Sequence, residues 1–253
     1  MPHLGCDQET CAQARAHPAP HHRVAALAIV ETDRWWLVDA TPDMPAQIES
    51  MGDLPLAGIL LTHAHMGHYT GLMYLGRESV DADHVPVYAS RAMSEFLTGN
   101  APWSQLVAMG QIELHPFESG HPLRLGGRLQ VTPWRVPHRD EFADTHGFEV
   151  EFLHQGRLLY VPDIDRWESW DKKLADLVGR VDYLVIDGSF FSGEELPGRD
   201  MTQIPHPTVL HTMDLIETAV GVSSTKVIFT HLNHTNPLWD TGSEAAAELE
   251  RRG

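Results

Sequence analysis

An apolar segment, Gly58 to Thr62, leads directly into three histidines, His63, His65 and His68. The segment predicts a buried strand, and residues two apart on an extended chain face the same way. His63 and His65 can therefore converge on one metal ion, while His68, beyond the bend at Gly67, points to a neighbouring position. A zinc site of this kind takes histidine nitrogens and carboxylate oxygens and keeps one position open for water.

Length and composition predict one globular domain with a substantial core. The chain has 253 residues, of which 42% are apolar and 21% charged, and no Ser/Gly-rich tract or run of charge divides it. We therefore expect a single domain over residues 1–253. The longest apolar runs are far too short to cross a bilayer, so no membrane span is expected.

Charge and histidine content narrow the expected partners. The 35 acidic residues outnumber the 18 basic ones, and the formal net charge is −17. Such a chain repels the phosphate backbone of long nucleic acids, which favours a small-molecule substrate. With 17 histidines but only two cysteines, the composition favours a metal protein over a disulfide scaffold. No signal peptide is recognisable, which predicts a cytoplasmic location unless an upstream export signal is missing. The oligomeric state is left open.

The order of predicted elements favours an α/β architecture. Strands are predicted at Ala25–Val30, Trp35–Val38, Gly58–Thr62, Val85–Ala89, Leu129–Arg135, Phe148–Leu153, Arg157–Val161, Tyr183–Ile186 and Lys226–Thr230. Helices are predicted at Pro45–Met51, Gly71–Leu75, Arg91–Thr98, Trp170–Leu177 and Val209–Ala219. Strands dominate first and helices then interleave, which is typical of two sheets flanked by helices.

The histidine cluster and its companions resemble the metallo-β-lactamase superfamily. The segment Thr62 to His68, followed by Thr70-Gly71-Leu72, is similar to that family's THxHxDH signature. Later segments follow in the family's order: Val136-Pro137-His138, Leu159 to Asp163, and Val227 to His231. The resemblance spans nearly the whole chain and implies an αββα sandwich, in which helices flank two mixed β-sheets.

Two further segments resemble one group within the superfamily. Asp182 to Phe190 and Thr230 to Pro237 are most similar to the pyrroloquinoline-quinone biosynthesis protein B group. The phosphodiesterase of the carbon–phosphorus lyase pathway and the tRNA 3′-processing endonucleases are more distantly similar. In these relatives a His-x-Thr segment supplies a catalytic histidine, and His206-Pro207-Thr208 stands in the corresponding place.

The resemblance implies a ligand set and a reaction. It implies one metal held by His63, His65 and His138, a second held by His68 and His231, and Asp163 as their bridge. One or two Zn²⁺ ions are expected, with Mn²⁺ or Fe²⁺ as other candidates. Asp163 and His206 are the implied catalytic residues: a metal-activated water attacks, and His206 donates a proton to the leaving group. We therefore expect a metal-dependent hydrolase of a small phosphodiester or related ester.

Gly67 is the clear departure from the family pattern, because most members have an aspartate there. Losing one carboxylate ligand weakens the second metal position and favours a single ion or a metal other than zinc. Two alternatives therefore stay open: an iron-dependent oxidative enzyme of pyrroloquinoline-quinone biosynthesis, and a non-catalytic metal-binding or carrier protein. Asp165 is an alternative to Asp163 as the bridge, and Asp187 is a candidate for supporting the site.

The amino-terminal segment Gly5 to Ala12 resembles a CxCxxC segment that holds a structural zinc in related groups, although Gln8 replaces the middle cysteine. Cys6, Cys11 and His234 are the implied ligands, and His3 or a water would complete the tetrahedron. A reduced pair of thiols or a disulfide are the alternatives. Relatives also begin with a strand and a Gly-rich turn and end with another strand, so we expect this sequence to be truncated at both ends.

Overall fold

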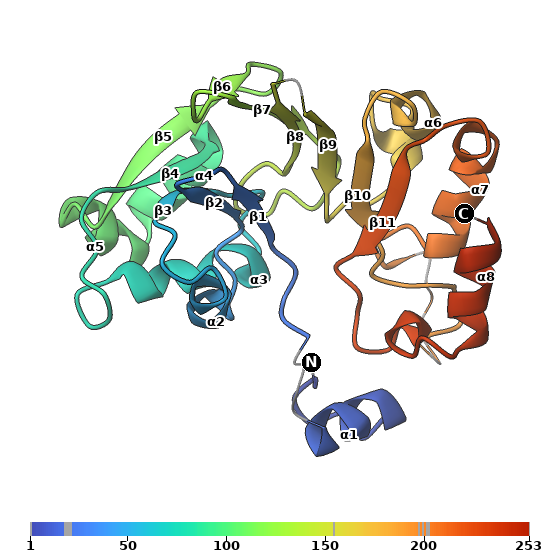
Figure 1. Ribbon diagram of the computed structural model, residues 1–253. Helices are drawn as coiled ribbons and strands as arrows, with labels where there is room; N and C mark the ends of the chain where they lie inside the picture. Colours follow the sequence, from blue (N-terminus) through green and yellow to red (C-terminus); the bar gives the residue numbers. More distant parts are fainter. Residues whose placement is uncertain are drawn as a thin grey trace.

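The computed structural model describes residues 2–17, 22–153, 155–196, 198, 200 and 203–252, and helices flank two mixed sheets in it (Figure 1). The five-stranded sheet has the order β1 (Leu27–Val30), β2 (Trp35–Val38), β3 (Leu56–Leu60), β4 (Val85–Ser90) and β5 (Ile112–Phe117). The six-stranded sheet has the order β11 (Lys226–Thr230), β10 (Tyr183–Asp187), β9 (Gly156–Val161), β8 (His146–Phe152), β7 (Leu129–Arg135) and β6 (Leu123–Arg124). The α/β sandwich implied by the sequence is thus confirmed.

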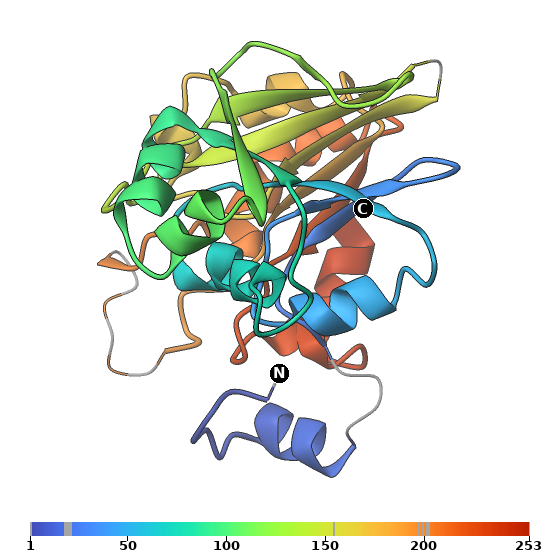
Figure 2. The ribbon, with the colours of Figure 1, turned by 90° about the vertical axis from the view of Figure 1, so that its left-hand side faces the viewer.

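The helices form the two outer layers. On the five-stranded sheet lie α2 (Met44–Glu49), α3 (Met66–Tyr69), the 3₁₀ helix η1 (Thr70–Leu75), α4 (Arg91–Gly99) and α5 (Trp103–Ala108). On the six-stranded sheet lie η2 (Trp167–Ser169), α6 (Leu174–Leu177), α7 (Val209–Val220), η4 (Pro237–Trp239) and α8 (Glu244–Arg252). Figure 2 shows α4 and α5 in front of the sheets, and α1 (Glu9–Ala16) outside the body of the domain.

Alternate side chains of β2 pack into two different hydrophobic cores, one between the sheet and its helices and one between the two sheets. Trp35 and Leu37 face the helices of the five-stranded sheet, while Trp36 and Val38 face the other sheet. All four are almost fully buried, and a strand places successive side chains on opposite faces. Phe148 joins Trp36 in the core between the sheets. This core holds the two sheets, and therefore the loops at their edges, in a fixed relation.

Strand directions bring the polar loops to one edge. β2 and β3 are parallel, as are β9, β10 and β11, so the carboxyl ends within each set lie together. β7 and β9 are both antiparallel to β8 and therefore also point the same way. Within the described residues, no helix has the length and apolar character needed to cross a membrane.

All nine predicted strands are present, but the helices were predicted less well. The pattern missed β5 and β6, as well as α1, α3, α5 and α8. β5 is an edge strand that contains Pro116, a residue that edge strands tolerate and central strands do not. The predicted helix Trp170–Leu177 is wrong in its first half, because Trp170 is extended and its indole donates to the Arg135 carbonyl at 2.7 Å. The predicted helix Gly71–Leu75 is a 3₁₀ helix.

The core between the sheets can be tested at Phe148, whose side chain is fully buried. Phe148→Ala removes a large apolar group and leaves a cavity, so it should lower the free energy of unfolding by about 3–5 kcal/mol. Urea unfolding followed by circular dichroism measures this. Phe142→Ala is the control, because Phe142 is 65% exposed, and its loss should change stability by about 0.5 kcal/mol or less.

Candidate metal centre

The loops that follow β3, β7, β9 and β11 bring the predicted ligand residues together. The nearest ligand atoms of His63, His65, His138 and Asp163 all lie within 4.8 Å of one another, and so do those of His68, Asp163 and His231. Each of these two groups could hold a metal ion. Asp163 belongs to both groups, the position that a bridging residue would take.

The Asp163 carboxylate is the centre of the arrangement. One of its oxygens, Oδ2, lies 3.5 Å from His63 Nε2, 3.4 Å from His68 Nε2 and 3.5 Å from His231 Nε2. The other, Oδ1, lies 3.4 Å from His138 Nε2. The Asp163 residue is only 3% exposed, so water does not compete effectively for these contacts.

The hydrogen bonds assign tautomers that leave some of these nitrogens without a proton, so each of these could donate a lone pair to a cation. The Thr62 hydroxyl donates to Asp39 and so accepts from His63 Nδ1 at 2.9 Å, which leaves His63 Nε2 without a proton. Similarly, His138 Nδ1 faces Asp165 at 2.6 Å and presents its bare Nε2 to the cluster. Among the described residues, His63 Nε2 and Asp163 Oδ1 have no hydrogen-bond partner although both are buried. Buried polar atoms without partners are rare, and a metal ion fits this donor set.

Residues outside the predicted ligand set hold the imidazoles in place. Asp39 accepts from His68 Nδ1 at 2.8 Å and, through Thr62, supports His63. Glu141 contacts His65 Nε2 at 2.9 Å, which leaves His65 Nδ1 facing His138 at 3.3 Å. Carboxylates in this position orient metal-binding histidines and raise their basicity. Sequence reasoning missed Asp39 and Glu141; a polar residue directly after the strand Trp35–Val38 was the available signal for Asp39.

The buried carboxylates of this cluster are stabilised by nearby positive charge, as the pKa values of its residues show. Burial alone lowers the pKa of His68, but the carboxylates of Asp39 and Asp163 outweigh it and raise that pKa to about 10. Burial and the nearby His68 lower the pKa of His63. Burial alone raises the pKa of Asp163, but the surrounding imidazoles, His231 and His68 first, hold it well below its usual value. A metal cation satisfies the same carboxylates without protons, since its ligands must be deprotonated.

His206 lies beside this centre in a separate hydrogen-bonded group. Its Nδ1 lies 2.8 Å from Asp187, 3.2 Å from the Ser189 hydroxyl and 3.3 Å from Asp163, so Nε2 is the nitrogen left for a ligand. Burial lowers the pKa of His206, but Asp187 and Asp163 reverse this and raise it to about 8. The Ser189 hydroxyl also lies 2.9 Å from His231 Nδ1. Asp187 therefore supports His206, and Asp165 supports His138.

Gly67 leaves open space at the second group. A Cβ atom added there would meet nothing nearer than Val24 Cγ1, at 4.0 Å. Gly67 also lies in α3, where other residues adopt the same backbone conformation. The missing aspartate is thus not excluded by packing or by the backbone.

The amino-terminal cysteines form a further cluster with His234. Ligand atoms of Cys6, Cys11 and His234 lie within 4.8 Å of one another, and Cys11 Sγ is 3.7 Å from His234 Nδ1. Both cysteines are free thiols in the structure. The His3 ring stacks on His234 with centroids 4.3 Å apart. Two sulfurs and an imidazole nitrogen are suitable zinc ligands.

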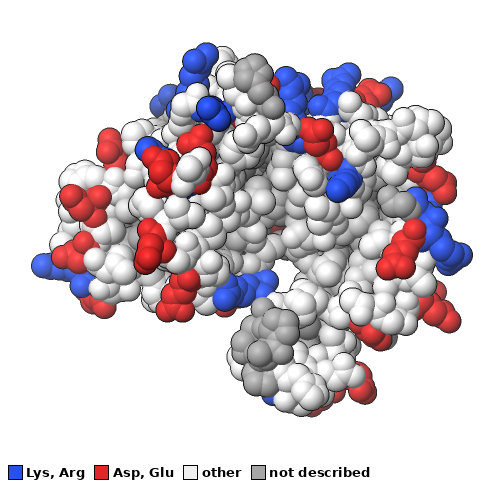
Figure 3. Space-filling view, in the orientation of Figure 1, with Lys and Arg blue, Asp and Glu red and all other residues white. Residues whose placement is uncertain are grey.

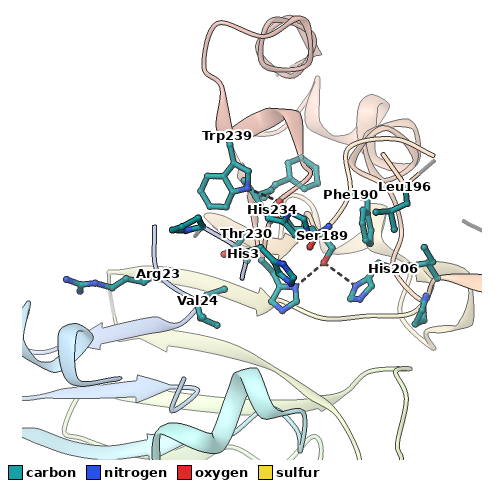
Figure 4. Close-up of a pocket in the computed structure, with 18 of the residues that line it drawn as sticks. His3, Arg23, Val24, Ser189, Phe190, Leu196, His206, Thr230, His234 and Trp239 are labelled. Carbon is teal, nitrogen blue, oxygen red and sulfur yellow. Dashed lines mark hydrogen bonds between the residues drawn. The ribbon is translucent and has the colours of Figure 1, made fainter. Parts of the chain in front are cut away.

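A pocket of about 1060 Å³ joins the metal centre to this cluster (Figure 4). His206, Ser189 and His231 line one part of it, and His3 and His234 line another. None of the described residues that line it is acidic, although Arg23 and Arg139 are among them. Figure 3 shows acidic side chains spread over the outer surface, whereas the central hollow is bordered mainly by uncharged residues.

The two-sheet fold and the cluster of histidines around Asp163 agree with the result of a comparison with known protein families. Residues 34–232 match the model of the beta-lactamase superfamily domain, so the chain is a member of that superfamily. The solved structure of a human tRNase Z, short form, is similar in fold, with a TM-score of 0.60 and 18% identity over 86% of this chain and 88% of that one.

More specific similarities point to one group of relatives. The coenzyme PQQ synthesis protein B of Ectopseudomonas mendocina is 26% identical over the whole of this chain and 92% of its own length. The structure of Zn²⁺-bound PqqB from Methylobacterium extorquens has a TM-score of 0.81, 20% identity and coverage of 100% of this chain and 91% of that one. A diphosphatase from the PhnP family has a TM-score of 0.68 and 20% identity, over 94% and 83%. The resemblance to the protein B group is confirmed.

Asp165 provides a test of the supporting carboxylates. Asp165→Asn keeps the size of the side chain but removes the charge that faces His138 Nδ1. We expect metal affinity of the first group to fall about 10- to 100-fold while the fold is retained. Competition with a chromophoric chelator measures the affinity. Asp171→Asn, at a side chain that is 81% exposed, is the matched control, and equal loss in both variants would contradict the assigned support.

Gly67 provides a test of the second group. Gly67→Asp places a carboxylate in the open space and adds negative charge near His68, so affinity for a second divalent ion should rise on the order of tenfold. Metal content after dialysis at fixed free Zn²⁺ measures this. Gly67→Asn, which has nearly the same shape without the charge, should raise it far less.

Proposed function

We propose that this protein is a metal-dependent hydrolase that cleaves a small phosphodiester or a related ester. The observation that carries the proposal is the convergence of two groups of ligand atoms on one buried carboxylate, Asp163. The open pocket beside them gives a substrate access to the same place. Structural similarity to a diphosphatase and to a tRNase Z agrees with cleavage at phosphorus.

His63, His65, His138 and Asp163 would hold one ion, and His68, Asp163 and His231 would hold a second. Bound divalent metals lower the pKa of a coordinated water and stabilise negative charge on the reacting ester. Asp39, Asp165 and Glu141 orient the histidines, and the buried setting of Asp39 strengthens its contacts. With no carboxylate at position 67, the second group has one anionic ligand, Asp163, which favours weaker binding there.

His206 is the proposed proton donor to the leaving group. Asp187 and Ser189 hold its Nδ1, so Nε2 faces the pocket that His206 lines. A donor fixed by a carboxylate in this way is suited to general acid catalysis. Asp163 is proposed to bridge the two ligand groups, and its Oδ1 lies 3.3 Å from His206 Nδ1.

A role in coenzyme PQQ synthesis is the second candidate function. It is favoured by the similarity to coenzyme PQQ synthesis protein B, which extends over the whole chain. The lack of an aspartate at position 67 also favours a site that differs from those of ordinary hydrolases. In this case iron as the resident metal and uptake of oxygen with an aromatic substrate are expected. A non-catalytic metal carrier predicts bound metal with neither reaction.

Metal analysis combined with an ester assay tests the proposal. Protein purified without added metal is expected to contain zinc or manganese and to cleave bis(p-nitrophenyl) phosphate, with activity lost on chelation and restored by the metal. His63→Ala should lose both metal and activity. His206→Ala should keep the metal while kcat falls about 100- to 10,000-fold.

The control variant is His211→Ala. His211 is an exposed residue that pairs with Glu168 at 2.6 Å, so its loss should leave both metal content and kcat unchanged. Iron as the purified metal, with oxygen uptake and no ester cleavage, would favour the second candidate. Protein free of any metal with the cluster intact would contradict both.

A further inference from the structure

The amino-terminal segment, residues 2–17, reaches the pocket without packing on the hydrophobic core. Its helix α1 contributes no residue to the core clusters of the described chain, and it projects from the body in Figures 1 and 2. Pro2 and His3 nevertheless line the pocket that contains His206. Apart from Cys11, which is fully buried, apolar burial therefore does not explain why this segment lies where it does.

Contacts around Cys11 and His234 hold the segment in place. Cys11 Sγ accepts from the His3 backbone N–H at 3.4 Å and lies 3.7 Å from His234 Nδ1. The Arg15 guanidinium donates to the carbonyls of His3 and Cys6. The segment is thus folded around its own thiols, and His234 is where it contacts the domain.

The loop that carries His234 also carries a residue of the metal centre. His231 is three residues earlier and has a left-handed backbone, with φ of 61°. The Asn233 N–H donates to the Ser189 carbonyl at 2.9 Å, and the Ser189 hydroxyl contacts His231. The loop is therefore attached to the domain beside the metal centre, and the amino-terminal segment meets it at His234.

We propose that residues 2–17 form a wall of the substrate pocket, held in place by the cluster of Cys6, Cys11 and His234, and that His3 contacts the substrate. In Figure 4, His3 and His234 lie at one side of the pocket and His206 at the other. The His3 ring nitrogens have no hydrogen-bond partner among the described residues, so they are available to a ligand. The proposal rests on the proposed function only in taking this pocket as the substrate site.

The amino-terminal cluster should then control binding and not the chemical step. In a Cys6→Ser/Cys11→Ser double variant we expect the dissociation constant for bis(p-nitrophenyl) phosphate to rise about fivefold to tenfold. It is taken from KM where the probe is cleaved and from calorimetry where it is not. Metal at the His63–His231 centre and kcat should be retained. Hydrogen–deuterium exchange of the peptide spanning residues 2–17 should increase, since the wall is no longer held.

His3→Phe separates contact with the ligand from clamping of the segment, because it keeps an aromatic ring to stack on His234 and removes the ring nitrogens. It should weaken ligand binding several-fold while exchange in residues 2–17 stays near that of the wild type. Leu4→Ala is the matched control, because Leu4 is 95% exposed and does not line the pocket, and it should change neither quantity.

Three results would contradict the proposal that residues 2–17 form a wall of the substrate pocket. The first is that the probe does not bind to the wild type. The second is a dissociation constant that is unchanged in both the double variant and His3→Phe. The third is a double variant that loses the metal of the main centre together with kcat. Binding of the probe without its cleavage would reject the proposed hydrolysis, while the change in dissociation constant would still decide the role of the wall.

Discussion

A single buried carboxylate organises this protein. Asp163 lies among five imidazoles, each within 3.5 Å, and an ionised group in such a place is stable only with cations or good donors around it. The two sheets supply these partners from opposite sides: His63 and His68 follow β3 of one sheet, and His138 and His231 follow β7 and β11 of the other. The sandwich fold is therefore the means by which histidines distant in sequence reach one aspartate.

The histidines that cluster around Asp163 were predictable because the sequence around each of them carries a local signal. His63 and His65 alternate directly after an apolar strand, and Asp163 and His231 each end a segment with strong β propensity. Such short-range patterns need no knowledge of the fold. The family resemblance then added the order of the segments, which is why the strands and the residues that cluster at their ends were predicted together.

The supporting residues were harder to predict because their roles exist only in three dimensions. Glu141 lies 76 positions from His65 in the chain and contacts it only after folding. Asp165 was weighed as an alternative bridge, but the structure places it against His138 Nδ1. Trp170 shows the same limit for secondary structure, since a tertiary hydrogen bond holds it extended where its sequence suggests a helix.

The contacts of Asp39 fix the distance between the two ligand groups. It holds His68 directly and His63 through Thr62, while its own backbone N–H donates to Leu60 of the neighbouring strand at 2.9 Å. The separation of the two groups is thus tied to the register of β2 against β3. Strand registers that keep each side chain on its face change only in steps of two residues, roughly 7 Å. The spacing is therefore not continuously adjustable, and sequence changes in β2 or β3 will either preserve it or abolish it.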